Sequence, residues 1–231
     1  MFEKPVNKLI MENLIFRNAT ITDVPFLATA IIEAEKSGTD KLSYSTIFGL
    51  TEEEVRSYLQ EMLYEEIDGC ELSISSFIIA EYNGQPAGAL SAWIEGKDGI
   101  PSAILKGNLL SYILPKRCIE RAAALNSMLH EIYIEYVPNT IQIGAGYVAP
   151  EYRGHRIHGM LHQEIISRRS KENPEITKVL SQTFDCNAPS LRSKEKTEYT
   201  VLETKETSNQ EILNYLPSNK KVVMMKELFT N

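Results

Sequence analysis

The sequence predicts an α/β fold in which a central, twisted mixed sheet carries helices on both faces. Three observations indicate this: amphipathic stretches in the first 70 residues, a hairpin signal at Asn83-Gly84, and a strand, loop, helix and strand in the second half. Asn-Gly favours a tight turn between antiparallel strands, whereas a helical crossover favours parallel pairing. The sheet should therefore contain strands of both kinds.

The first half of the chain alternates β-rich runs with helical patterns. Thr22 or Asp23 can cap the first helix, and the T-E-E-E run that begins at Thr51 fits a capping box for the second. The expected elements are a strand at 14–17, a helix at 24–36, a helix at 51–69, and antiparallel strands at 76–82 and 87–94.

The second half opens with a segment that we interpret as an insertion between two strands. It covers about residues 96–139 and is mostly helical, with a helix expected from Pro115 to Ile132. After it we expect a strand at 140–148, a helix that ends near Glu172, a strand at 178–184, a short helix at 187–196, and β runs at 199–204 and 222–225.

Charge and cysteine content narrow the class of protein. The 231 residues include 24 Lys and Arg against 31 Asp and Glu, a formal net charge of −7. We therefore expect no nucleic-acid partner and no membrane partner. Three cysteines without a C-x-x-C pair, and a start without a signal-peptide pattern, predict a cytoplasmic protein. We expect a flexible extension at 1–12 followed by one domain at 13–231.

The chemistry is concentrated between Tyr147 and Leu161, which read YVAPEYRGHRIHGML. A helix that starts directly after a strand presents unpaired backbone N–H groups and the positive end of its dipole, which favour a phosphate. Arg153 and Arg156 add positive charge there, and arginine can bind phosphate oxygens in bidentate fashion. An ordinary strand-to-helix loop with solvated arginines is the alternative.

The run V-x-P-x-x-R-G-x-x-I-x-x-x-L, from Val148 to Leu161, resembles the acetyl-CoA-binding motif of the GNAT superfamily of N-acetyltransferases. The order of elements over residues 13–95 and 140–228 is also similar to that fold. The family's loop reads R-x-x-G-x-G or R-x-x-G-x-A, so Arg153 matches, whereas Arg156 and His158 occupy the two small-residue positions. Either these side chains point away and the amides still bind, or they crowd the cofactor out.

The resemblance implies an N-acetyltransferase that moves an acetyl or short acyl group from acetyl-CoA to a primary amine, by direct attack in a ternary complex. The acceptor would be a small-molecule amine or a protein amine, and a homodimer is allowed. Tyr147 and Val148 would bind the cofactor through strand amides in a gap between splayed strands. The implied cofactor-binding residues are Tyr147, Val148, Arg153, Gly154, His155, Arg156, Ile157, His158, Gly159 and Asn187.

The resemblance leaves the catalytic residues unknown. In the family, a tyrosine seven residues after the cofactor-binding asparagine can protonate the CoA thiolate, and Lys194 stands at that position after Asn187. Lys194 could supply the proton, but a lysine exposed on the surface of a helix is the simpler expectation. Glu135, His130 and Asp185 are candidates for a base by chain position alone.

Two other functions stay open: a non-catalytic protein and a zinc hydrolase that uses the histidines of the helix. A non-catalytic acyl-CoA-binding or degenerate protein is favoured if Arg156, His158 and Lys194 abolish the chemistry. His158 and His162 are four residues apart on one helix face, a spacing that can bind zinc, but the H-E-x-x-H pattern and a third ligand are missing. We therefore expect no metal and solvated or phosphate-adjacent histidines.

Overall fold

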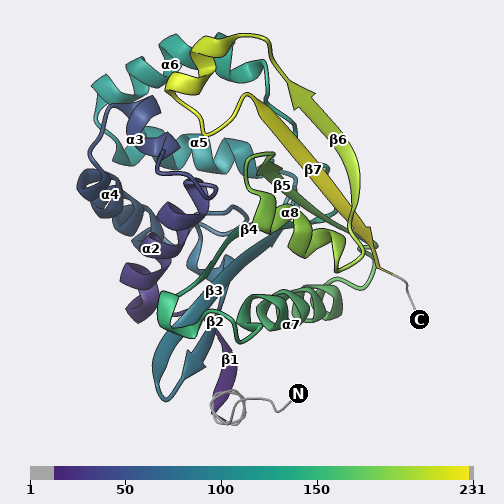
Figure 1. Ribbon diagram of the computed structural model, residues 1–231. Coiled ribbons are helices and arrows are strands. Elements are labelled where there is room, and N and C mark those ends of the chain that lie inside the picture. Colours follow the sequence, from purple (N-terminus) through teal and green to yellow (C-terminus); the bar gives the residue numbers. More distant parts are fainter. Residues whose placement is uncertain (1–12, 229–231) are drawn as a thin grey trace.

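The computed structural model describes residues 13–228, and its elements follow the expected order along the chain (Figure 1). The expected extension at 1–12 lies outside the described residues. The strands are β1 (Leu14–Asn18), β2 (Phe77–Tyr82), β3 (Gln85–Ile94), β4 (Ile141–Val148), β5 (Lys178–Phe184), β6 (Thr200–Glu206) and β7 (Lys220–Glu227). The α-helices are α2 (Val24–Glu35), α3 (Ser43–Phe48), α4 (Glu52–Tyr64), α5 (Ser102–Ile113), α6 (Lys116–His130), α7 (Ile157–Glu172) and α8 (Ala188–Glu195).

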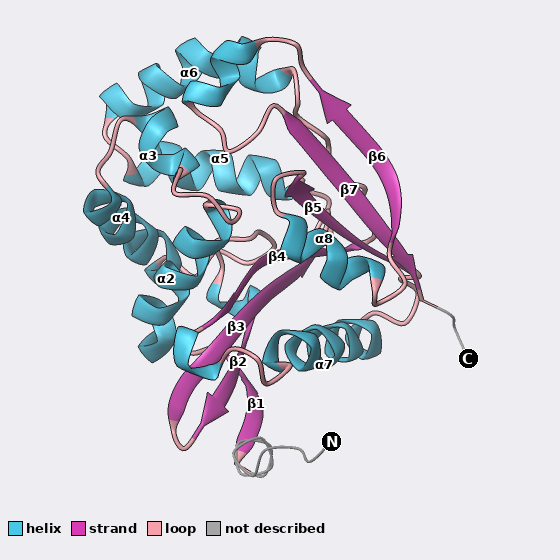
Figure 2. Cartoon of the chain, in the orientation of Figure 1, coloured by secondary structure: helices cyan, strands magenta, loops and turns pink. Residues whose placement is uncertain are grey.

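The strands form one mixed sheet in the order β1-β2-β3-β4-β5-β7-β6, which confirms the predicted fold class (Figure 2). β4 and β5 pair in parallel through the crossover helix α7, and the other neighbouring pairs are antiparallel. The hairpin between β2 and β3 turns at Asn83 and Gly84, whose φ angles of 50° and 76° suit a type I′ turn.

Helices cover both faces of the sheet, as the strand pattern requires. α2 packs on β3 and β4, whereas α7 packs on β2, β3 and β4 from the other side. Alternate residues of β2 separate the two cores: Ile79 lies with the helices of the first half, and Ile78 lies with the α7 residues Ile157 and Leu161. The sheet is therefore the wall between two hydrophobic cores.

The local signals for helix starts are partly confirmed. Thr51 Oγ1 accepts a hydrogen bond from the Glu54 amide at 3.2 Å, and Glu54 Oε2 accepts one from the Thr51 amide at 2.8 Å, so the capping box at α4 is present. Asp23 precedes α2 but does not cap it by its side chain. Its carboxylate accepts from the Thr20 amide and from Arg17 instead.

The sequence did not indicate α3, and it indicated α5 only as part of the mostly helical segment expected at about 96–139. α3 is only six residues long and has few good helix formers, so it depends on the burial of Tyr44 and Phe48. α5 has apolar residues on several sides and no clear amphipathic pattern. Its start is held by Glu95, whose carboxylate accepts from the Ser102 amide at 2.9 Å. Within residues 13–228, every helix is too short or too polar to cross a membrane.

Candidate functional site

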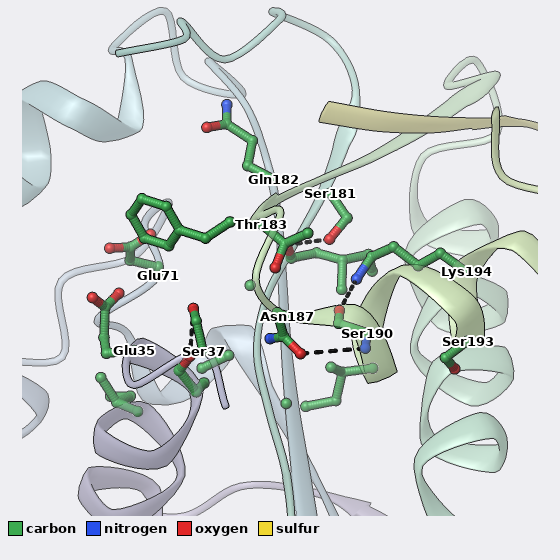
Figure 3. A pocket seen from close by; sticks show the side chains of 18 of the residues that line it. Glu35, Ser37, Glu71, Ser181, Gln182, Thr183, Asn187, Ser190, Ser193 and Lys194 are labelled. Atoms are coloured by element: carbon green, nitrogen blue, oxygen red, sulfur yellow. Dashed lines mark hydrogen bonds between the residues drawn. The ribbon is translucent and has the colours of Figure 1, made fainter. Parts of the chain in front are cut away.

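β4 and β5 separate shortly after they begin to pair. Their parallel register runs from Ile141 opposite Val179 to Ile143 opposite Ser181 and stops there, although both strands continue. A cavity of about 550 Å³ opens where they part. Its walls are Gly144 to Gly146 of β4, the second half of β5, and side chains from α2, α5, α7, α8 and β7 (Figure 3). The gap is the central feature of the site.

The two glycines of β4 allow side chains to pack tightly against the strand beside this gap. A Cβ on Gly144 would lie 2.5 Å from Ser91 Oγ, and a Cβ on Gly146 would lie 2.8 Å from His158 Nε2. The sequence indicated a close approach at these glycines, and the groups that approach are the protein's own side chains. The His158 imidazole thus lies against Gly146 and lines the cavity.

The loop before α7 contains two residues with positive φ, and one of them, Arg156, occupies a small-residue position of the family motif. Gly154 and Arg156 both lie in the left-handed region, with φ of 86° and 61°, although Arg156 carries a side chain. That side chain is exposed and does not line the cavity. The first hydrogen bond of the helix runs from the Met160 amide to the Arg156 carbonyl at 3.1 Å. The helix itself therefore does not use the amides of 157–159.

Arg153 connects the end of β4 to this loop. Its Nε donates to the Val148 carbonyl at 3.0 Å, and its guanidinium lies 6.0 Å from the centre of the Tyr147 ring. The side chain is exposed, so its remaining N–H groups face solvent beside the helix start. The Ile157 side chain is buried in the core, so only the backbone of this residue can offer a polar group at the helix start. His155 lies half-buried in the loop.

α8 contributes the opposite wall, and here one expectation is wrong. Asn187 lines the cavity and caps α8, since its side chain accepts from the Ser190 amide at 3.3 Å. Lys194 is not an exposed helix lysine: it is only 9% exposed and lines the cavity. Its Nζ donates to Ser190 Oγ at 2.8 Å, and burial lowers the pKa of Lys194 to about 8. The helix turns this face inward, a fact that its short sequence does not signal.

His158 and His162 are not solvated either. His162 is buried, and its Nε2 lies 2.8 Å from the Tyr199 hydroxyl. Burial lowers the pKa of both histidines, that of His162 to about 4, so both are neutral at pH 7. Over residues 13–228 there is no group of three His, Cys, Asp or Glu side chains that could hold a metal ion.

Two carboxylates from distant segments meet at the side of the cavity opposite Lys194 (Figure 3). Glu71 pairs with Lys106, and the Tyr136 hydroxyl donates to it at 3.4 Å. Burial opposes the charge on Glu71, but Lys106 outweighs that effect and the pKa of Glu71 is lowered. Glu71 is therefore a fixed anion.

Glu35, the last residue of α2, differs from Glu71. Its carboxylate makes no hydrogen bond or ion pair with any residue in 13–228, and burial raises its pKa. Lys221 of β7 also lines the cavity, and burial lowers its pKa. Two carboxylates with pKa values shifted in opposite directions are typical of acid and base groups in enzymes.

The three bases proposed from chain position do not lie in this cavity. Glu135, His130 and Asp185 are all exposed and outside its lining. The sequence missed Glu35 and Glu71 because α2 and the segment after α4 meet only in the folded chain. The available signal was weak: Glu35 is one of two glutamates near the end of a mostly apolar helix.

Residues 44–196, more than half of the chain, match the acetyltransferase (GNAT) family. The chain belongs to this family. The match confirms the resemblance drawn from residues 148–161, and acyl transfer with acetyl-CoA is the general chemistry of the family. No curated protein matches the chain significantly in sequence.

Solved structures of acetyltransferases share the fold of this GNAT chain. An N-acetyltransferase from Staphylococcus aureus Mu50 has a TM-score of 0.63 at 11% identity, covering 92% of this chain and 100% of its own. Polyamine N-acetyltransferase from Drosophila melanogaster has a TM-score of 0.55 at 13% identity, covering 93% of this chain and 100% of its own. Ribosomal-protein-alanine N-acetyltransferase from Brucella melitensis has a TM-score of 0.51 at 16% identity, covering 93% of this chain and 99% of its own. The last two are named for different acceptors, a polyamine and a ribosomal-protein alanine, so the fold alone does not identify the acceptor of this GNAT chain.

Proposed function

We propose that this protein is an acetyl-CoA-dependent N-acetyltransferase that passes an acetyl or short acyl group to a primary amine, by direct attack in a ternary complex. The observation that carries the proposal is the cavity between β4 and β5, with Lys194 on one side and Glu35 on the other. A donor and an acceptor can meet there without a covalent enzyme intermediate. The three cysteines do not line the cavity.

The residues present fit acetyl-CoA. The free amides of 157–159 and the positive end of α7 suit its diphosphate, and Arg153 adds charge beside them. The facing edges of β4 and β5 past Ile143 and Ser181 no longer pair with each other and offer main-chain groups for the pantetheine arm. Asn187 lines the same space. When bound, acetyl-CoA supplies a thioester, whose acetyl group forms a bond to the amine nitrogen as the C–S bond breaks.

Glu35 is the group best suited to take a proton from the amine. A primary amine with a pKa of about 10.4 is mostly protonated at pH 7, and releasing that proton costs about 4.6 kcal/mol. A carboxylate with a raised pKa is a better base than the Lys106-bound Glu71. Glu35 therefore removes the proton, and Glu71 holds Lys106 and Tyr136 in place.

Lys194 is the group best suited to return a proton to the sulfur. Its pKa of about 8 lies near that of a thiol, so its ammonium can give up a proton without a large energetic penalty. The hydrogen bond to Ser190 Oγ orients the ammonium group. A buried lysine here replaces the tyrosine that the GNAT motif carries at this position.

The proposal is tested by binding and turnover together. Calorimetric titration with CoA and acetyl-CoA should show saturable binding, and a panel of primary amines should stimulate release of free thiol from acetyl-CoA. Saturable binding without thiol release for any amine would instead indicate the non-catalytic acyl-CoA-binding protein. That alternative draws support from the His158 imidazole, which occupies part of the cavity beside Gly146.

A further inference from the structure

A second, open cavity of about 520 Å³ adjoins the first and is lined mainly by residues of α3, α5 and α6. The residues that line both cavities are Glu35, Ser43, Ile47 and Lys106. We call the second cavity the helical groove and these four residues the junction. Two of the three helices that form the groove belong to the segment at 96–139, between β3 and β4.

Beyond the junction the helical groove is lined mostly by apolar residues, and Ser111 and Asn126 add uncharged polar groups. Its walls include Phe48 of α3, Leu110 of α5, and Ile119 and Leu129 of α6. Small residues such as Gly107, Ala122 and Ala123 leave the space open. Its charged lining residues are Glu35 and Lys106, both at the junction, and Lys106 already pairs with Glu71. The groove therefore suits an apolar body that carries no charge of its own.

The junction presents two hydrogen-bond acceptors without donors. Glu35 has no hydrogen-bond or ion-pair partner within residues 13–228. The Ser43 hydroxyl is buried and also has no partner among the described residues. Buried polar groups of this kind are costly unless a ligand satisfies them. A primary amine has two or three N–H donors, which matches this pair.

Building on the proposed N-acetyltransferase function, we propose that the acceptor is a primary amine with an extended apolar body. The body lies in the helical groove between α3, α5 and α6, and the nitrogen lies at the junction between Glu35 and Ser43. From there the nitrogen faces the cavity between β4 and β5. A polyamine is disfavoured, because its second cation would lie against apolar walls without a carboxylate.

The test compares amines of increasing length in an assay of thiol release from acetyl-CoA. Across the n-alkylamines from propylamine to octylamine, kcat/KM should rise about fourfold per methylene, equivalent to about 0.8 kcal/mol each, until the groove is filled. Spermidine should be a poorer substrate than octylamine. Equal kcat/KM for propylamine and octylamine, or a preference for spermidine, would overturn the proposal.

Two substitutions on α6 form a matched pair. Both positions are exposed, but only Ala123 lines the groove. Ala123→Trp should therefore fill the groove, whereas Ala124→Trp adds the same side chain outside the lining. Ala123→Trp should lower kcat/KM for octylamine at least tenfold and change that for propylamine less than threefold, and Ala124→Trp should change neither. Equal behaviour of the two variants would contradict the groove assignment.

A binding measurement separates this proposal from the proposed function. Octylamine should bind the CoA-saturated protein in calorimetry even where turnover is slow, and Ala123→Trp should weaken that binding. Thiol release with short amines but no octylamine binding would overturn the groove alone. Failure of CoA itself to bind would overturn the acetyltransferase function, whatever the amine result.

Discussion

The ammonium group of Lys194 lies 2.8 Å from the hydroxyl of Ser190, one turn earlier on α8. This hydrogen bond holds a buried cation at the edge of the cavity between β4 and β5. Desolvation lowers the pKa of Lys194 to about 8, so the group can donate a proton near neutral pH. The pair thus places a group that can donate a proton at the position where the GNAT motif has a tyrosine.

Lys194→Met should lower kcat for amine acetylation about 100-fold, the usual effect of losing a general acid. In the wild type, kcat should fall as the pH rises above about 8, where Lys194 loses its proton. This decline should be absent in Lys194→Met and reappear at higher pH in Lys194→Tyr. Lys196→Met, which removes an exposed lysine of the same region, is the control. An unchanged pH profile in Lys194→Met would assign the acid elsewhere.

The same substitution should stabilise the fold at neutral pH. The pKa of Lys194 is about 8 in the folded chain against 10.5 in the unfolded chain, so burying the ammonium costs free energy below pH 8. Between about pH 8 and 10.5 the unfolded chain binds more protons, and wild-type stability rises with pH. Lys194→Met should therefore gain about 1–3 kcal/mol at pH 7, and less at pH 10. Urea unfolding at the two pH values measures this, and an equal gain at both would refute it.

Glu35→Gln should lower kcat about 100-fold by removing the base. Because burial raises the pKa of Glu35, wild-type kcat should fall as the pH drops through that raised value, where the carboxylate becomes protonated. Glu35→Gln should lose this fall of kcat at low pH, which is the acidic limb of the pH profile. The control is Glu33→Gln, since Glu33 is exposed and pairs with Lys36 away from the cavity. A full acidic limb in Glu35→Gln would point to another base.

Arg153→Ala should weaken CoA binding about tenfold, because a charged hydrogen-bond donor beside the diphosphate site is lost. The loss should shrink at high salt, since the contact is exposed and screened. Arg192→Ala removes an exposed arginine from α8 and should leave the affinity unchanged. Calorimetric titration with CoA at low and high salt measures the loss of affinity and its dependence on salt. Equal affinities for wild type and Arg153→Ala would exclude the phosphate role.

Arg156→Gly should stabilise the protein by about 1 kcal/mol, because Arg156 has a φ of 61° and glycine adopts that conformation without a Cβ penalty. The exposed side chain makes no contact with the cavity whose loss would offset the gain. Thermal unfolding is the measurement. A lower midpoint than the wild type would show that the side chain contributes more than the strain costs.

Local patterns predicted most of the fold. The Thr51 capping box, the Asn83-Gly84 turn and the helical repeat of Ile157, Leu161 and Ile165 all act within a few residues, and the structure contains each one. α3 and α5 lack such signals, since they form mainly through packing with neighbouring segments.

By itself, the sequence determined the order of strands and helices and the strand-to-helix turn with Arg153 and Gly154 at the start of α7, because backbone sterics and short-range hydrogen bonds decide these features. The tertiary structure alone decided that Lys194 is buried and that Glu35 and Ser43 share a junction. Solvent exposure and charge balance depend on segments far apart in the chain, and a pKa is set by that assembled environment and not by neighbours in sequence.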